Sequence, residues 1–410
     1  MRSLKLLKAI AVAAFIFPGS FILAEEASDA DDEKKIAEEL ERAEKNVPAP
    51  VSLPTQQTGQ ISAGWGNQGG SMATDRVNFP NILVAVDAMA EQDLGSQRQG
   101  SNSAFIRTAE FGFTGAVDYM LQGMVLFAMH REAGEYKLDP HEISVEFTTL
   151  PWNLHAKVGR MFVDGGRMMR RHQHDWSFTT VPLMHKKMID PAIGEGILDT
   201  GGEISWLAPW SFFQEIKFGV FNGRYFGHSH NDGTDKPLPL LNGRVKQFLP
   251  ISGYAGILVG VTYLHYSPTQ DKGDADQTFG GDITYKWQKN RISALEIGIE
   301  GLYRSETRVV ARPEDKFGMF AFISYQFLTF WKIGYRFDLF NRYSVLSSRT
   351  GLAYDPQDIA SSVWVAYHPS EFSTFRLTLE YYQPDGVNDP YLSAYLQMVY
   401  ILGFHPPHTF

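Results

Sequence analysis

The chain contains no cysteine among its 410 residues. Disulfide bridges, thiolate zinc sites, a cysteine nucleophile and a lipid-modified N-terminal cysteine are therefore excluded. It also has no basic block, and its net charge is −9, which argues against nucleic acid as a partner because phosphate binding needs a concentrated positive surface. Beyond residue 79 no apolar run reaches the ~18 residues of a membrane helix. What is abundant is aromatic residues, at 13%, and glycine, with 37 copies, a balance typical of a large β-structure.

The first residues have the pattern of a secretory signal peptide, which we place at 1–24. Three basic residues, Arg2, Lys5 and Lys8, precede a short apolar run that ends in small residues before the acidic stretch from Glu25. Such a run is too short to serve as a membrane anchor. A retained N-terminal helix is the alternative. We expect the mature protein to work outside the cytoplasm.

Residues 25–78 are expected to form a short periplasmic helix and a linker. Charged helix formers dominate the first part, where Ile36, Leu40 and Ala43 make a narrow apolar stripe. Two interpretations fit this stripe, a seam between subunits and a solvated or disordered tether. Prolines between residues 48 and 54 end any helix.

Beyond residue 79 the chain consists of segments of about ten residues in which apolar and polar side chains alternate. In the segment 331–339 every odd position is aromatic or aliphatic, whereas the even positions hold Lys332, Gly334, Arg336 and Asp338. A period of two with one fully apolar face predicts a strand between two different solvents. By this criterion we predict strands near residues 80–89, 105–116, 119–130, 140–149, 153–163, 201–208, 211–221, 243–250, 254–266, 278–288, 292–304, 316–327, 330–339, 358–368, 372–383 and 391–402.

The connections between these strands alternate in length. Brief turns, such as those at 117–118 and 151–152, alternate with long polar connections, such as 131–139 and 164–200. This rhythm is typical of outer-membrane barrels, in which a sheet must close because no water can pair with an exposed edge in hydrocarbon. We therefore predict an all-β fold, a transmembrane up-and-down antiparallel β-barrel of about 16 strands over residues 79–410, in the outer membrane of a Gram-negative bacterium. A secreted soluble sandwich would not need this rhythm.

A barrel of this size encloses an aqueous lumen, and its longest connection is placed to narrow it. The connection 164–200 follows the fifth strand, where general porins carry a loop that folds inward. Its arginines favour anions at a constriction, although contacts with lipopolysaccharide phosphates or neighbouring acids explain them equally well. The residues that we expect in the lumen or at the constriction are Lys157, Arg160, Arg167, Arg170, Arg171, Glu296, Lys332, Arg336 and Arg376.

Two histidine-rich motifs are candidate metal ligands. His172, His174 and Asp175 lie on the longest connection, and His228 and His230 lie on the next one. Imidazole suits zinc, copper or nickel, and the two motifs together would complete a tetrahedral zinc site. The alternative is that these rings only form hydrogen bonds. No other cofactor is expected, and no spacing singles out a nucleophile or a general base, so enzymatic activity is not expected.

One stretch of the chain also resembles a known family. The residues that carry the resemblance are Lys157-Val-Gly-Arg-Met-Phe162, His172-Gln-His-Asp-Trp176, Pro182-Leu183, Gly194-Glu-Gly196 and Ser205-Trp-Leu-Ala-Pro209. They are similar to those of Gram-negative outer-membrane proteins labelled zinc-regulated TonB-dependent outer-membrane receptors, and more distantly to those of phosphate-selective porins. Because the region before residue 79 is too short for a plug, the resemblance implies a porin-like barrel with a regulatory or substrate-related link to zinc.

The resulting functional hypothesis is passive diffusion of small hydrophilic solutes or ions, linked to zinc or anion uptake. Two alternatives remain open: a non-conducting barrel that binds a metal or ligand at the surface, and a barrel sheath around a partner protein. Expected contacts are membrane lipid and lipopolysaccharide. A homotrimer is expected by analogy with other barrels of about this size.

Overall fold

The computed structural model describes residues 80–95, 102–132, 134–191, 193–227, 233–290, 292–343, 345–346 and 353–403. The expected signal peptide, N-terminal helix and linker, and the candidate ligands His228 and His230, lie outside these residues. Within them, no helix has the length and hydropathy of a bilayer span.

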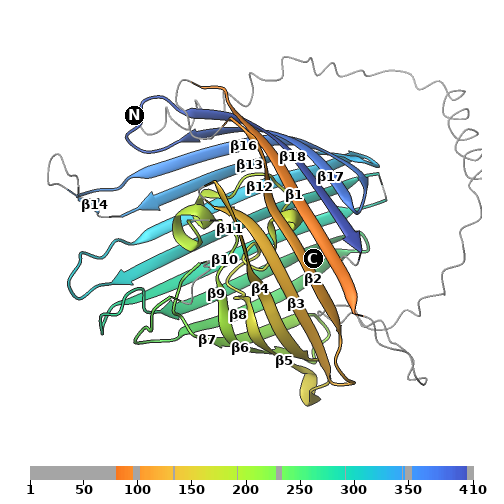
Figure 1. Ribbon diagram of the computed structural model, residues 1–410, viewed down its shortest axis with the longest axis vertical. Coiled ribbons are helices and arrows are strands. Elements are labelled where there is room, and N and C mark those ends of the chain that lie inside the picture. The colour runs from red at the N-terminus through yellow and green to blue at the C-terminus, as the bar shows by residue number, and fades with distance from the viewer. Residues whose placement is uncertain are drawn as a thin grey trace, which may run out of the picture. The chain divides into compact units, whose positions relative to one another are not determined.

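Sixteen antiparallel strands form one closed barrel (Figure 1). Each strand pairs with its neighbours along the chain, and β1 pairs with β18 to complete the wall. The barrel strands are β1 (Asn81–Asp93), β2 (Ala104–Ala116), β3 (Leu121–Glu132), β4 (Glu135–Phe147), β5 (Leu154–Phe162), β6 (Leu198–Leu207), β7 (Gln214–Phe221), β8 (Leu240–Ser252), β9 (Ala255–Tyr266), β10 (Ala275–Gln288), β11 (Ala294–Thr307), β12 (Lys316–Leu328), β13 (Trp331–Arg342), β16 (Gln357–Ser370), β17 (Ser373–Gln383) and β18 (Tyr391–Gly403). The prediction of an all-β, up-and-down barrel is confirmed.

Two details differ from the prediction. The connection expected at 131–139 is mostly strand, because β3 and β4 continue pairing as far as Glu132 and Glu135. These strand ends extend beyond the apolar band of the wall, and their residues are therefore mostly polar. The sequence pattern there consequently resembles that of a loop. The connection between β13 and β16 also contains a small hairpin, β14 (Val345–Leu346) with β15 (Ala353–Tyr354), that alternation did not reveal.

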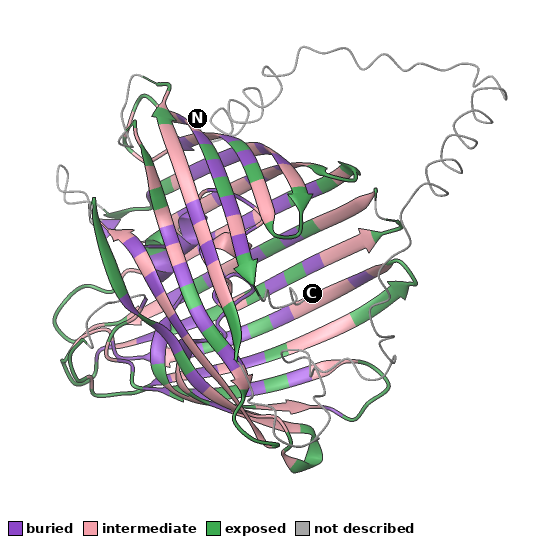
Figure 2. Cartoon of the chain, turned by 45° about the vertical axis from the view of Figure 1, so that its right-hand side comes forward, coloured by how far each residue is buried: buried purple, intermediate pink, exposed green. Residues whose placement is uncertain are grey.

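The barrel wall is apolar outside, whereas its inner face carries charged side chains beside an apolar patch. Along β7, Glu215 and Lys217 are buried, whereas the intervening Ile216, Phe218 and Val220 are exposed. Figure 2 shows the same alternation of buried and exposed positions on the other strands. This arrangement is the reverse of that in a soluble domain, and it is the pattern expected when lipid surrounds the wall and water fills the interior.

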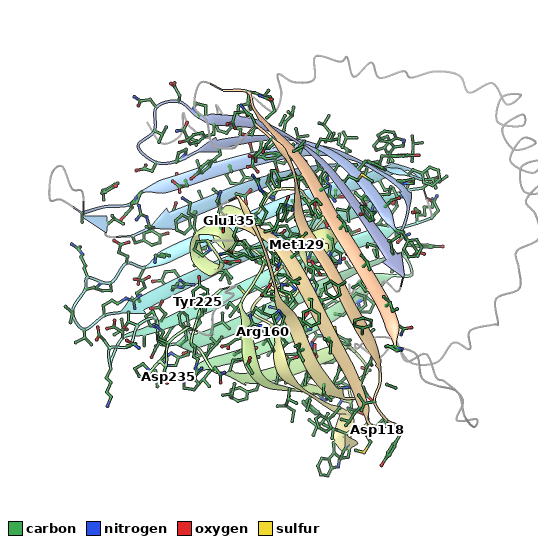
Figure 3. All side chains as sticks on the ribbon, viewed as in Figure 1. Asp118, Met129, Glu135, Arg160, Tyr225 and Asp235 are labelled. Atoms are coloured by element: carbon green, nitrogen blue, oxygen red, sulfur yellow. The ribbon has the colours of Figure 1, made fainter. Side chains whose placement is uncertain are left out.

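Large aromatic side chains gather at the rim of short turns. In Figure 3, Asp118 marks this rim and Asp235 marks the rim with longer connections. Trp210 at the turn between β6 and β7 packs against Trp206 with ring centroids 6.2 Å apart. Exposed aromatic side chains at neighbouring turns are Tyr119, Trp152, Phe212, Tyr254, Phe330 and Phe372. A belt of aromatic rings at one rim is what a membrane–water interface favours.

The connection between β5 and β6, residues 163–197, lies inside the barrel, and we call it the inserted segment (Figure 1). It contains a 3₁₀ turn, η2 (Gln173–Asp175), and a π-helical turn, η3 (His185–Ile189). Its apolar side chains form a buried core with inward-facing residues of the wall. The core members from the segment are Val163, Met168, Met169, Trp176, Phe178, Leu183, Met184, Met188, Ile189 and Ile197, and those from the wall include Leu264, Leu302, Phe320, Phe322 and Trp364.

Candidate functional site

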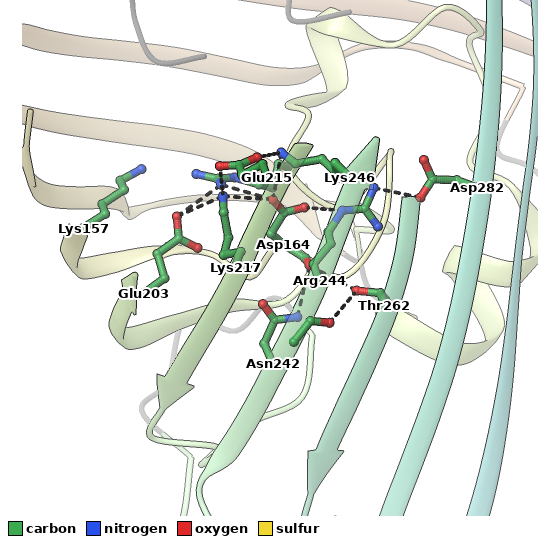
Figure 4. Close-up of polar contacts among 12 residues, drawn as sticks. Lys157, Asp164, Glu203, Glu215, Lys217, Asn242, Arg244, Lys246, Thr262 and Asp282 are labelled. Carbon is green, nitrogen blue, oxygen red and sulfur yellow. Dashed lines mark hydrogen bonds and ion pairs between the residues drawn. The ribbon is translucent and has the colours of Figure 1, made fainter. Parts of the chain in front are cut away.

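The inserted segment starts at a buried carboxylate that gathers four cationic side chains (Figure 4). Asp164 Oδ1 lies 3.0 Å from Nε of Arg244, and Oδ2 lies 3.0 Å from Nζ of Lys217 and 3.4 Å from both Nζ of Lys246 and Nη1 of Arg170. Burial alone would raise the pKa of Asp164, but these cations hold it well below its usual range. The start of the segment is therefore an anion fixed among cations of β7 and β8.

Further acids on the wall balance this cluster. Lys246 Nζ lies 2.6 Å from Oε2 of Glu215, and Arg244 Nη2 donates to Oδ2 of Asp282 at 2.7 Å. Arg170 also reaches Oε1 of Glu203 at 3.2 Å. Because the charges are paired and buried, they bind the segment to the wall instead of standing free in the pathway.

On the opposite wall, three arginines hold the middle of the segment. Arg376 of β17 donates to the Trp176 carbonyl at 3.0 Å, and Arg107 of β2 and Arg336 of β13 donate to the carbonyls of Thr179 and Thr180. The segment is thus anchored on both sides of the barrel, and it crosses the lumen.

A cavity of about 910 Å³ lies between the inserted segment and the rim of short turns. The segment contributes Arg171, His174, Asp175 and Trp176 to its lining. The wall and the turns contribute, among others, Lys286, Glu296, Lys332, His368, Glu371, Phe372 and Arg376. The cavity therefore has room for small solutes and is lined by charges of both signs.

Basic groups outweigh acidic ones in the cavity. Glu296 forms an ion pair with Arg167, whereas Arg376 donates to two neutral oxygens, those of Gln397 and the Trp176 backbone. Burial and the nearby Arg167 guanidinium lower the pKa of Arg171 to about 10, so Arg171 stays charged at neutral pH. Four basic and three acidic side chains line the cavity. Because Arg167 pairs with one of the acids, Glu296, the lining carries a small excess of positive charge.

All but one of the expected lumen residues lie on the inner side of the barrel. Arg160 is the exception: it pairs in register with Ile143 and Thr200, on the outward face. Its Nε donates to the Pro140 carbonyl at 3.0 Å. The expectation for Arg160 is therefore wrong, because Lys157 faces inward and a residue three positions along a strand faces the other side.

The two described histidines of the motif 172–175 contact carboxylates of the wall. Nδ1 of His172 lies 3.2 Å from Oε2 of Glu110, and its Nε2 lies 3.1 Å from Oε1 of Glu142. His174 Nδ1 lies 3.2 Å from Oε1 of Glu110, and its Nε2 lies 3.4 Å from Asp175 Oδ1. Burial lowers the pKa of His172, but Glu110 and Glu142 raise it more, to about 10.

Three further residues, His130, His141 and Glu195, extend this cluster. Glu195 lies in the motif Gly194-Glu-Gly196 that carries the family resemblance, but none of the three was predicted to be a ligand. His141 Nε2 lies 3.0 Å from Oε2 of Glu195, and the His141 ring lies 5.1 Å from that of His130 and 5.0 Å from that of His172. Alternation along β3 places His130 on the inner face, so a parity count would have found it.

His141 owes its position to a β-bulge. The ladder between β3 and β4 skips one residue, because Leu126 pairs with Glu142 and Phe127 pairs with Pro140. His141 and Glu142 consequently both face the interior, although they are adjacent. Bulges re-aim side chains in this way, and simple alternation does not predict them.

Two overlapping sets of side chains in the cluster have the composition of a metal site. They are Glu110, His141 and His172, and His130, His141 and Glu195, and the ligand atoms of each set lie within 4.8 Å of one another. Ligands ~2.1 Å from one zinc ion lie at most ~4.2 Å apart, so only a small side-chain adjustment is needed. Of the predicted ligands, His172 belongs to a set, whereas His174 contacts Glu110 from outside the set and Asp175 contacts His174.

Comparison with known proteins connects the chain to a relative of unknown role. No protein-family model matches the chain. An uncharacterized protein of Aquifex aeolicus is 26% identical over an alignment of 297 residues, with coverage of 64% of this chain and 61% of that protein. The match therefore spans less than two thirds of the relative's length.

Several solved structures share the fold. The outer membrane channel DcaP of Acinetobacter baumannii has a TM-score of 0.54 and 10% identity, over 79% of this chain and 97% of DcaP. The anion-selective porin of Comamonas acidovorans has a TM-score of 0.53 and 8% identity, over 79% and 99% of the two chains. The trimer form of the outer membrane protein OmpT of Vibrio cholerae has a TM-score of 0.52 and 10% identity, over 79% and 100%. The first is a channel, the second a porin and the third an outer membrane protein, and the label of TonB-dependent receptor finds no support.

Proposed function

We propose that the chain is an outer-membrane channel for passive diffusion of small hydrophilic solutes or ions, narrowed by the inserted segment. The observation that carries this proposal is the closed barrel of sixteen strands with an apolar exterior, a charged interior and an inner cavity of about 910 Å³. The signal peptide at 1–24, the periplasmic region at 25–78 and the barrel from residue 79 complete the proposed organisation.

We propose that small anions are the favoured solutes. The cavity carries Arg171, Lys286, Lys332 and Arg376, and Arg167 neutralises Glu296. A similar solved structure is an anion-selective porin, which adds to this proposal. Membrane lipid and lipopolysaccharide are the proposed surroundings, and a homotrimer is proposed because a structural neighbour has a trimer form.

Conductance of the purified protein in a planar bilayer tests this function. We expect discrete conductance steps, with a reversal potential in a salt gradient that indicates preference for anions. Arg171→Ala should shift the preference toward cations, because it removes a charge from the cavity lining. Arg160→Ala is the matched control, since Arg160 lies on the outward face and should leave selectivity unchanged. Unchanged selectivity in Arg171→Ala would contradict the anion proposal.

A second candidate is a barrel that its own inserted segment occludes. The buried apolar core between the segment and the wall favours this alternative, because such packing leaves less of the lumen for water. Folded wild-type protein without conductance steps would support it. The sheath hypothesis is not favoured, since the inserted segment takes up interior space that a partner would need.

A further inference from the structure

The geometry points to a site for one divalent transition-metal cation at Glu110, His141 and His172, where the inserted segment meets β2 and β4. The proposed channel does not require this site. The inference therefore goes beyond the proposed function, and each can fail separately.

Each ligand is oriented by a second group, as metal-binding side chains usually are. Glu142 Oε1 lies 3.1 Å from Nε2 of His172 and can accept its N–H. Nδ1 then faces Glu110 Oε2, 3.2 Å away, and offers its lone pair to a metal once the proton on Nδ1 is replaced. A carboxylate that holds the far nitrogen of a histidine fixes both its tautomer and its ring orientation.

The same logic holds for the other two ligands. Glu195 Oε2 lies 3.0 Å from Nε2 of His141, so Nδ1 is the nitrogen that this ring offers to a metal. His174 Nδ1 lies 3.2 Å from Oε1 of Glu110, which leaves Oε2 as the coordinating oxygen. The site thus consists of two imidazole nitrogens and one carboxylate oxygen, with a partner behind each.

The electrostatics of the cluster favour a cation. The side chains of Glu110 and Glu195 are fully buried, and that of Glu142 is 9% exposed. Buried carboxylates are costly unless positive charge compensates them, and the nearest lysine, Lys157, lies 3.4 Å from Glu142. Without an ion, Glu110 and Glu142 keep His172 protonated at neutral pH. A divalent ion beside Glu110 would supply two charges and replace the proton on His172, because ligation requires a neutral imidazole.

The donor set selects the class of metal. Imidazole with carboxylate suits zinc and its first-row neighbours, whereas calcium and magnesium prefer sites made of oxygen alone. Three protein ligands leave the fourth position of a tetrahedral ion to water.

Among the described residues, this cluster would hold one ion. His141 is shared by both sets of side chains, and a neutral imidazole offers a lone pair on one nitrogen only. When Glu195 accepts the proton on Nε2, His130 and Glu195 cannot build a second site with the same ring.

The ion would be resident and not the transported solute. Of the three ligand side chains only that of His172 is partly exposed, at 15%, and the other two are fully buried. A bound ion would join the inserted segment, through His172, to Glu110 of β2 and His141 of β4. It would therefore fix one side of the segment to the wall.

Zinc binding to the purified full-length protein in detergent tests the site. Protein stripped with EDTA and dialysed against Zn²⁺ alone should retain one zinc ion per chain, and X-ray absorption should show two imidazoles among nitrogen and oxygen ligands. His141→Gln and His172→Gln should abolish this stoichiometric binding. Glu142→Gln, a change in a positioning residue, should weaken affinity about 10- to 100-fold with the stoichiometry retained. Calcium should not compete.

His368→Gln is the matched control, because His368 lines the cavity and contacts Thr374, away from the cluster. It should bind zinc like the wild type.

Circular dichroism should show an intact barrel in every variant, and the partly exposed His172 makes His172→Gln the variant least prone to misfold. Equal zinc binding by the wild type and the His141→Gln/His172→Gln double variant would overturn the site. Loss of zinc in a His228→Ala/His230→Ala variant would also overturn it. Conductance steps from stripped protein would support the channel whatever the zinc result.

Discussion

Asp164 is a single carboxylate on which the charge balance of one wall depends. Replacing it with asparagine should leave Arg170, Lys217, Arg244 and Lys246 without their common anion. Removing one partner from a buried ion cluster typically costs about 3–5 kcal/mol. We therefore expect Asp164→Asn to lower the free energy of unfolding by about that amount in urea titrations followed by tryptophan fluorescence.

The matched control is Asp235→Asn. Asp235 pairs with Arg224 at 2.7 Å, but its side chain is 85% exposed, and such pairs contribute little. An equal effect of the two substitutions would show that the buried cluster has no special role.

The depressed pKa of Asp164 predicts a pH dependence. A carboxyl group with a lowered pKa in the folded state stabilises the fold fully above its unfolded pKa and loses this effect as the pH falls through the folded value. The difference in unfolding free energy between wild type and Asp164→Asn should thus be constant from pH 7 to pH 5 and shrink below about pH 4. A difference that persists undiminished at pH 2 would contradict the assignment.

Gly318 of β12 makes room for the inserted segment. A Cβ atom there would lie 2.9 Å from Cβ and 3.1 Å from Cα of Met184, so a flexible side chain cannot simply move aside. We expect Gly318→Leu to displace η3, destabilise the protein by about 1–3 kcal/mol and raise single-channel conductance. Gly243→Ala is the control, because a Cβ atom on Gly243 would meet open space, with no described neighbour within 4 Å. Wild-type conductance and stability in Gly318→Leu would contradict this packing.

At the scale of elements, the inserted segment should set the size and selectivity of the pathway. Its two ends are adjacent, since Val163 N donates to the Ile197 carbonyl at 2.9 Å. A short glycine–serine linker can therefore replace residues 165–195 without breaking the ladder. We expect conductance to rise several-fold and charge selectivity to weaken. A variant that is folded but conducts like the wild type would show that the segment does not limit flow.

The elements also show how far sequence patterns reach. The position of each barrel strand was predicted to within a few residues. This was possible because the two faces of a strand meet different solvents, which produces the alternation of apolar and polar residues. The motif at His172 was predicted to bind a metal, but Glu110 and His141 were not predicted to lie beside it. The register between distant strands and the bulge at His141 do not change the alternation of apolar and polar residues from which the strands were predicted. The inward course of the segment was expected only from its length and position.

At the scale of the whole molecule, the reversed distribution of apolar and charged residues predicts where a charge is tolerated. Val261 lies in the middle of β9 and is 60% exposed, and Val310 lies in the connection between β11 and β12 and is 88% exposed. We expect Val261→Lys to destabilise the protein in lipid vesicles by about 2–4 kcal/mol, because a lysine at the bilayer midplane is poorly solvated.

Val310→Lys should leave the free energy of unfolding unchanged, because residue 310 lies in a connection that is exposed to water. The comparison requires urea unfolding of both variants in vesicles of the same lipid. Equal tolerance at the two positions would mean that lipid does not surround the barrel.

The inserted segment also reaches the line where the first and last strands meet. Thr179 Oγ1 lies 3.0 Å from Gln397 Oε1 of β18, and Gln397 Nε2 donates to Asp87 of β1 at 2.8 Å. Arg107, which donates to the Thr179 carbonyl, also pairs with Asp87. The junction between β1 and β18 is therefore stabilised from inside the barrel by the inserted segment, which precedes β18 by about 200 residues in the chain. The backbone ladder between β1 and β18 closes the wall by itself. The inserted segment adds side-chain contacts across that same junction, so the element that narrows the lumen also stabilises the closure of the barrel.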